Sequence, residues 1–153
     1  MGDRMKPLFA IALLLAAPAA AAPKDEVLAA TNAFMAALNS GDANGAEAMT
    51  HPTLTIQVLR FPPEGGSKFG VMTRQQLFDN FRNAPPRKFD ERIVRSKILV
   101  TRDYAHVWAP YTLDIDDKRI HCGVDSFGWS KIDGKWLLTT FGWTADPKGC
   151  PPK

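Results

Sequence analysis

The segment that most constrains the fold is residues 105–144, which we expect to form three consecutive antiparallel strands. Two tight turns, Asp116-Asp117 and Asp133-Gly134, separate its apolar-rich runs. An Asp-Gly pair between apolar runs is a strong sequence signal for a β-hairpin. The segment holds all four tryptophans, two of the three histidines and one of the two cysteines. Any ligand pocket in this protein is therefore expected to be lined by these strands.

The chain before these strands is predicted to begin with helices. Val27, Thr31, Phe34 and Leu38 recur every three or four residues and predict a helix over residues 24–40 with one apolar face. Capping residues predict two further helices: a short one over 43–49 capped by Asp42, and one capped by Thr73 with Gln76 in a capping box. Alternation of apolar and polar residues predicts a strand over 53–59 and a strand over 89–101 with a bulge near Arg95-Ser96. A loop is predicted over 61–70.

This order of elements predicts an α+β fold. Helices followed by a long antiparallel meander favour one cone-shaped, curved antiparallel sheet that wraps the N-terminal helices. The chain without residues 1–22 has about 130 residues, which suits one domain with its own core. We place that domain at residues 23–150, followed by a short tail at 151–153.

The pattern HCGVDSFGWSKIDGKWLL at residues 121–138, with the Thr73 helix and Cys150, resembles the nuclear transport factor 2-like superfamily. Residues 121–125 and 133–136 look most like its exported SnoaL-like, lumazine-binding branch. The resemblance implies a cystatin-like roll with a pocket between sheet and helices, and a small planar ligand. It implies no single activity, because isomerases, cyclases, dehydratases, ligand binders and dimerisation modules share this cone. The catalytic positions of the isomerase and dehydratase branches are only partly matched, so no catalytic set is transferred.

Residues 1–22 have the pattern of a secretory signal peptide. Arg4 and Lys6 precede an apolar run over residues 7–17, and small residues follow it. The alternative is a membrane span, but the run is shorter than the ~20 residues that cross a bilayer. We therefore expect an exported protein, periplasmic or secreted, that is not held in the membrane after cleavage.

The two cysteines, Cys122 and Cys150, are expected to form a disulfide bond. An oxidising compartment favours pairing, and the bond would tie the C-terminal tail to a central strand. The alternatives are a reactive thiol or a metal ligand, which no CxxC or Cys/His spacing supports.

Charge and motifs exclude several classes of function. The formal net charge is +3, and the lysines and arginines are scattered rather than clustered, so no nucleic-acid partner is expected. No histidine pair has HxH or HxxxH spacing, and neither a GxSxG elbow nor a phosphate-binding glycine loop is present. We therefore expect no metal and no cofactor.

His121 and Asp125 are the candidate catalytic residues. Strand alternation places them on one face with Phe127 and Trp129. They are about 13 Å apart at standard strand rise, so one substrate could contact both although they cannot contact each other. This geometry suits a general base and a remote orienting group. Alternatively, Asp125 is bonded to a neighbouring element and His121 is a packed, hydrogen-bonded histidine.

The candidate ligand-binding residues are aromatic. Aromatic side chains on strands form either a ligand platform or the core, and both alternatives stay open here. Trp108 and Tyr111 have opposite parity, so both can face a pocket only if Pro110 marks a bulge. The full candidate set is Trp108, Tyr111, Phe127, Trp129 and Trp143.

Three hypotheses for the function follow. The first is a binding module for a small apolar or planar molecule, which could form a homodimer through the sheet. The second is a cofactor-free isomerase, dehydratase or cyclase that uses Asp125 or His121 as acid or base. The third is a structural or dimerisation module without a ligand. The first two require a cavity of roughly 300 Å³ or more, and solid packing of Phe127 and Trp129 onto the first helix would argue against both.

Overall fold

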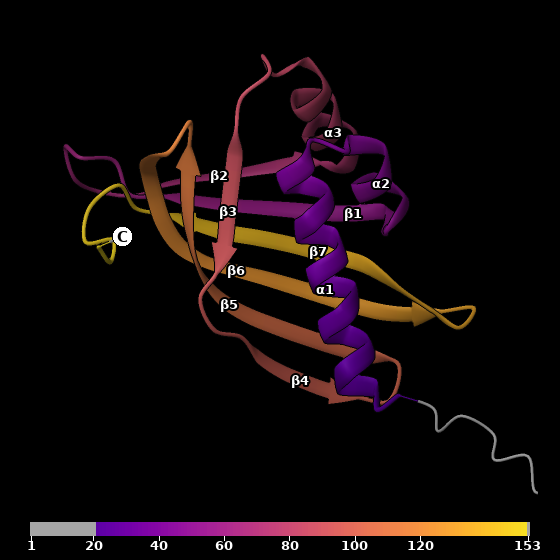
Figure 1. Ribbon diagram of the computed structural model, residues 1–153. Helices are drawn as coiled ribbons and strands as arrows, with labels where there is room; N and C mark the ends of the chain where they lie inside the picture. Colours follow the sequence, from indigo (N-terminus) through magenta and orange to yellow (C-terminus); the bar gives the residue numbers. More distant parts are fainter. Residues whose placement is uncertain (1–20, 153) are drawn as a thin grey trace, which may run out of the picture.

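The computed structural model describes residues 21–152, so most of the predicted signal peptide lies outside the described residues. Three helices, α1 (Pro23–Ser40), α2 (Ala43–Ala48) and α3 (Arg74–Asn83), accompany seven strands (Figure 1). The strands are β1 (Thr50–Arg60), β2 (Lys68–Thr73), β3 (Phe89–Ile93), β4 (Lys97–Thr101), β5 (Tyr104–Ile115), β6 (Lys118–Ile132) and β7 (Lys135–Ala145). No helix in this part of the chain is long and apolar enough to cross a membrane.

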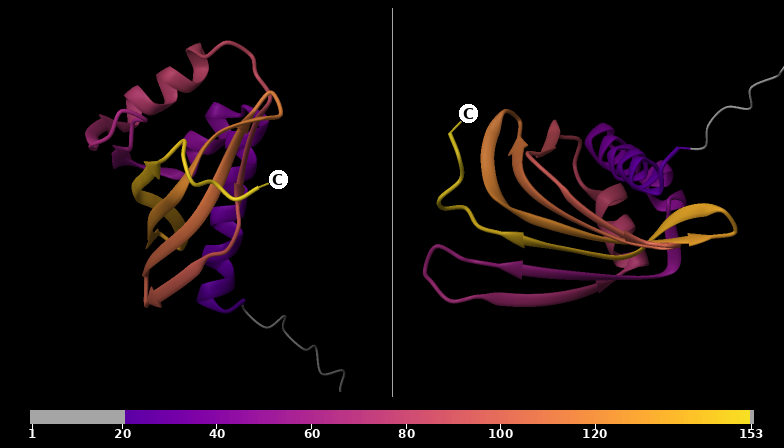
Figure 2. Two further views of the ribbon diagram at one scale, coloured as in Figure 1. Left: turned by 90° about the vertical axis from the view of Figure 1, so that its left-hand side faces the viewer. Right: turned by 90° about the horizontal axis from the view of Figure 1, so that it is seen from below.

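All seven strands form one curved sheet, which confirms the α+β cone. The strand order is β2-β1-β7-β6-β5-β3, and β4 also pairs with β5. Figure 2 shows α1 lying on the concave side of the sheet. Every pairing is antiparallel except that between β1 and β7, which is parallel. The meander of β5, β6 and β7 is therefore extended at one edge by the strand that follows the first two helices.

The core lies between α1 and the concave face of the sheet. The predicted apolar face of α1 is buried, and Phe34 is its central residue. The Phe34 ring makes edge-to-face contacts with Phe127, Trp129 and Phe141, with ring centroids 6.3, 6.4 and 5.7 Å away. Such contacts add to the stabilisation gained by removing the rings from water.

The local signals in the sequence placed the helix ends correctly. Gly41 ends α1 in a left-handed conformation with φ 77°, which glycine adopts without strain. The Asp42 side chain accepts a hydrogen bond from the Gly45 backbone N–H at 2.8 Å. Thr73 and Gln76 form both bonds of the predicted capping box.

Two predicted boundaries were wrong. The loop predicted over residues 61–70 ends earlier, because β2 begins at Lys68 and pairs with β1. The single bulged strand predicted over 89–101 is two strands, β3 and β4. Both pair with β5, along successive parts of its length. The residues between β3 and β4 therefore carry the chain from one part of β5 to the next.

The disulfide between Cys122 and Cys150 ties the C-terminal tail to β6, and its Cα atoms are 5.5 Å apart. Cys122 and Asp146 also exchange two backbone hydrogen bonds of 3.0 and 2.8 Å. Beyond them, the Lys148 ammonium group donates to the Pro63 carbonyl oxygen at 2.8 Å. The tail is therefore fastened both to the central meander and to the β1–β2 loop.

We expect the double variant Cys122→Ser/Cys150→Ser to unfold at lower denaturant concentration than the wild type. Loss of the cross-link should lower the free energy of unfolding by roughly 3 to 4 kcal/mol, because the unfolded chain gains conformational entropy. Urea unfolding with and without a thiol reductant measures this. The reductant should shift the wild type and leave the double variant unchanged. Identical midpoints for the oxidised wild type and the variant would contradict a stabilising cross-link.

Candidate functional site

A cavity of about 550 Å³ lies between the sheet and the helices, beyond the Phe34 core. Leu38 of α1 and Leu77 and Phe81 of α3 form one wall. Phe141 separates the cavity from the core, because it lines the cavity and also stacks on Phe127 with centroids 5.1 Å apart. The walls are mainly apolar, as in sites for small organic ligands.

Two carboxyl groups, those of Glu91 on β3 and Asp125 on β6, line this apolar cavity. They are hydrogen-bonded to each other. The Asp125 side chain is only 1% exposed, and among the described residues no group donates a hydrogen bond to its Oδ2. Two ionised carboxylates this close in an apolar site repel each other strongly, so one of them must keep a proton.

The surroundings of the two carboxyl groups raise the pKa of both. Burial raises the pKa of Asp125 well above its usual range, and the negative charge of Glu91 and the hydrogen bond to Glu91 add to this rise. Burial also raises the pKa of Glu91, to about 7, although the hydrogen bond with Asp125 opposes the rise. Because their hydrogen bond raises the pKa of Asp125 and opposes the rise for Glu91, Asp125 is the member of the pair that keeps its proton as the pH passes neutrality.

The Asn39 side chain at the end of α1 fixes the position of Glu91. Its amide nitrogen donates to the Glu91 carbonyl oxygen and its amide oxygen accepts from the Glu91 N–H, both at 2.8 Å. This pair of bonds replaces the strand partner that β3 lacks on that side. The helix thus holds the strand, and the strand presents the glutamate to the cavity.

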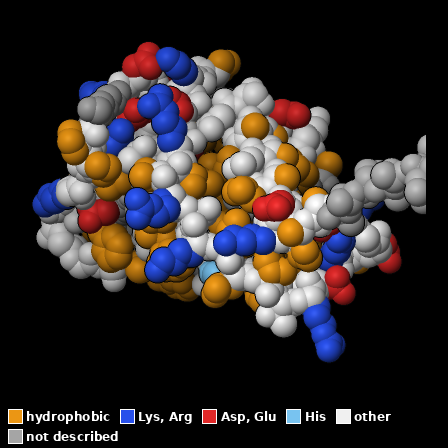
Figure 3. All heavy atoms as spheres, turned by 60° about the horizontal axis from the view of Figure 1, so that its bottom comes forward, with side chains coloured by type: hydrophobic (Ala, Val, Ile, Leu, Met, Phe, Trp, Pro, Cys, Tyr) orange, Lys and Arg blue, Asp and Glu red, His pale blue; other side chains and the backbone are white. Residues whose placement is uncertain are grey.

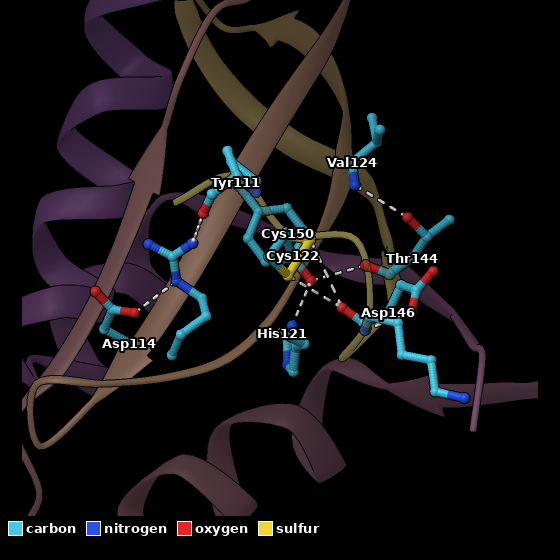
Figure 4. The surroundings of a disulfide bond; sticks show 11 residues. Tyr111, Asp114, His121, Cys122, Val124, Thr144, Asp146 and Cys150 are labelled. Atoms are coloured by element: carbon cyan, nitrogen blue, oxygen red, sulfur yellow. Dashed lines mark hydrogen bonds and ion pairs between the residues drawn. A yellow bond between two sulfur atoms is a disulfide. The ribbon is translucent and has the colours of Figure 1, made fainter. Parts of the chain in front are cut away.

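His121 lines the same cavity and forms a short hydrogen-bonded chain with Tyr111 and Thr144 (Figure 4). The Tyr111 hydroxyl donates to the Thr144 carbonyl oxygen at 2.7 Å and lies 3.1 Å from His121 Nδ1. Since the hydroxyl proton is used, Nδ1–H is the donor in the second bond and Nε2 is left as an acceptor. Burial, and then the charge of Arg60, lower the pKa of His121, so the ring is neutral.

The structure separates the aromatic residues that the sequence grouped together. Trp143 lines the cavity, whereas Phe127 and Trp129 are fully buried against α1. Tyr111 is also buried and reaches the site through His121. Trp108 is 47% exposed and lines a separate outer groove. Pro110 causes no bulge, because the β5–β6 register is continuous from Tyr104 to Leu113.

Phe127 and Trp129 do pack onto the first helix, yet a ligand-sized cavity remains. The reason is that α1 contacts these rings through Phe34, whereas the cavity begins at Leu38, one turn further along the helix. On one face of β6, His121 and Asp125 therefore line the cavity, and the later residues of that face pack in the core.

The sequence interpretation missed Glu91. A signal was present, because Phe89, Glu91 and Ile93 share one parity and place a charged residue on an apolar strand face. A buried carboxyl group on such a face needs a partner, and Asp125 is that partner. No group of three or more His, Cys, Asp or Glu residues within residues 21–152 could hold a metal ion.

Comparisons with known proteins bear on the fold. No family model and no curated protein matches the sequence. Among solved structures, a nuclear transport factor 2-like protein from Cytophaga hutchinsonii is similar, with a TM-score of 0.67, 15% identity, and coverage of 82% of this chain and 99% of that chain. A candidate dehydratase of the same fold family from Streptomyces avermitilis has a TM-score of 0.58 and 13% identity, covering 80% and 94%.

A third similar structure is the CamKII hub homology domain of the alga Chlamydomonas reinhardtii, with a TM-score of 0.63, 17% identity, and coverage of 82% and 98%. One architecture is thus shared by a candidate enzyme and a hub homology domain, and identities this low establish architecture alone. From its helices, its seven-stranded curved sheet and these similarities, the chain has the nuclear transport factor 2-like fold.

Proposed function

We propose that this protein binds a small, largely apolar molecule in the cavity beside Glu91 and Asp125. The observation that carries the proposal is the cavity itself, about 550 Å³ of space with mainly apolar walls and one pair of carboxyl groups, of which Asp125 is buried and Glu91 is half-buried. A protein that used the cone only as a scaffold would gain stability by filling that space with side chains. The open volume therefore favours binding over a purely structural role.

The carboxyl pair limits which chemical groups of a ligand can bind at the inner end of the cavity. Asp125 keeps its proton there, so the pair can donate a hydrogen bond to a neutral acceptor such as a carbonyl or hydroxyl oxygen. An anionic group at the same place would face the charge that the pair already carries. The part of the ligand that reaches Asp125 should therefore be uncharged.

A second candidate function is acid–base catalysis of the isomerase, dehydratase or cyclase type without a cofactor. The proton shared by Glu91 and Asp125 supports it, because a carboxyl group with a pKa near neutrality can both release and accept a proton. The neutral His121 ring supplies a further acceptor on the same cavity. A bound compound that is recovered unchanged favours the binding function, and one that is consumed only when Asp125 is intact favours the enzyme.

We further propose that the protein is exported and forms a homodimer through the outer face of its sheet. The signal-like residues 1–22 and the disulfide support export. Exposed Phe69 and Trp108 line the outer groove and support association, because exposed large apolar side chains favour contact with a partner.

Binding of a neutral apolar probe tests the proposed cavity. We expect N-phenyl-1-naphthylamine fluorescence to increase on binding the wild type, and Leu77→Trp to weaken that binding at least tenfold by filling the cavity. Leu99→Trp is the matched control, since Leu99 is exposed on β4 and does not line the cavity. Equal titrations for all three proteins would show that the cavity is not where the probe binds.

The shared proton predicts a stability that depends on pH. Since the pKa values of both carboxyl groups are raised in the folded state, folding takes up protons, and the contribution of the pair is complete below about pH 4. The part due to Glu91 is lost as pH rises through about 7, and the part due to Asp125 is lost at higher pH. Asp125→Asn should flatten the fall in unfolding free energy between about pH 5 and about pH 8, by up to about 1.4 kcal/mol per pH unit for one proton.

Chemical denaturation at several pH values measures this effect. The exposed Asp103→Asn is the matched control and should keep the wild-type slope. Parallel curves for the wild type and Asp125→Asn would contradict the shared proton.

A further inference from the structure

A cationic rim lies at the mouth of the cavity, opposite in character to the carboxyl pair inside. Arg60 ends β1 and Lys68 begins β2; the two are cross-strand neighbours, and both line the cavity. Lys68 has an exposed ion-pair partner, Glu64, at 3.2 Å. The Arg60 side chain makes no hydrogen bond or ion pair with any group described in residues 21–152. Its guanidinium group is therefore available to a ligand.

The charge of Arg60 acts within the cavity as well as at its edge. After burial, Arg60 is the second cause that lowers the pKa of His121, which lines the cavity. It also opposes the rise that burial, Asp125 and Glu91 produce in the pKa of Tyr111. The guanidinium group thus lies on the same side as the His121–Tyr111 pair, close enough for its field to reach both rings.

Among residues 21–152, the other arginines do not form a comparable site. Figure 3 shows lysine and arginine side chains spread among apolar and acidic ones on one face of the molecule. Several of the arginines are ion-paired, including Arg74 and Arg82 with Glu47 and Arg119 with Asp114. Arg60 differs because it combines an unpaired guanidinium group with the border of an apolar cavity.

We propose that the ligand is an apolar organic anion, whose single negative group binds Arg60 at the mouth while its uncharged end points toward Glu91 and Asp125. This inference rests on the proposed binding function. An anion placed at the inner end would meet the carboxyl pair, whereas at the mouth it meets the guanidinium group, whose planar N–H groups match an oxyanion. The apolar walls at Leu77, Phe81 and Trp143 lie between the two ends and suit the hydrophobic body.

A pair of related probes tests the anionic requirement. 8-Anilinonaphthalene-1-sulfonate carries a sulfonate on nearly the same aromatic body as the neutral N-phenyl-1-naphthylamine. We expect Arg60→Gln to weaken binding of the sulfonate probe roughly threefold to tenfold, as fits a partly exposed ion pair, and to leave the neutral probe unchanged. Added salt should weaken sulfonate binding to the wild type more than to the variant.

Arg95→Gln is the matched control, because Arg95 is exposed in the β3–β4 connection and does not line the cavity. It should change the affinity of neither probe. If both probes bind the wild type and Arg60→Gln weakens neither, the anionic inference is wrong and the binding function stands. If neither probe binds, or Leu77→Trp leaves both titrations unchanged, the proposed cavity function fails first and the anionic inference fails with it.

Discussion

Two carboxyl groups that face each other inside an apolar cavity resist ionising together, and this constraint governs the site. Asp125 and Glu91 satisfy it by holding one proton between them. The arrangement persists because Asn39 fixes the backbone of β3 at Glu91 through two hydrogen bonds. An acidic pair with one fully buried member costs stability, so its presence beside open space is easier to understand as part of a binding site than as part of a core.

The first helix divides the concave face of the sheet into two regions of different character. Phe34 closes one region by packing against the aromatic rings of β6 and β7. One turn later, Leu38 borders the cavity. The first region supplies the buried apolar area that stabilises the cone, and this allows the second to keep a cavity and charged groups that reduce stability.

Local signals in the sequence predicted most of the fold, and long-range contacts account for what they missed. The caps at Asp42 and Thr73 and the Asp133-Gly134 turn depend on neighbouring residues, so the sequence reveals them. His121 and Asp125 were placed on one strand face because alternation is local as well. Glu91 could not be assigned to the site in this way, since its partners Asn39 and Asp125 come from distant parts of the chain and only the folded sheet brings them together.

The fastened C-terminal tail also bears on how the proposed ligand would enter and leave the cavity. Ala145 and Pro147 border the cavity, and the chain that follows them is held by the disulfide to β6 and by Lys148 to the β1–β2 loop. These ties restrain outward movement of that border. Reduction of the disulfide removes one of these restraints, so under the proposed binding function oxidation lengthens the residence time of a bound molecule in addition to stabilising the fold.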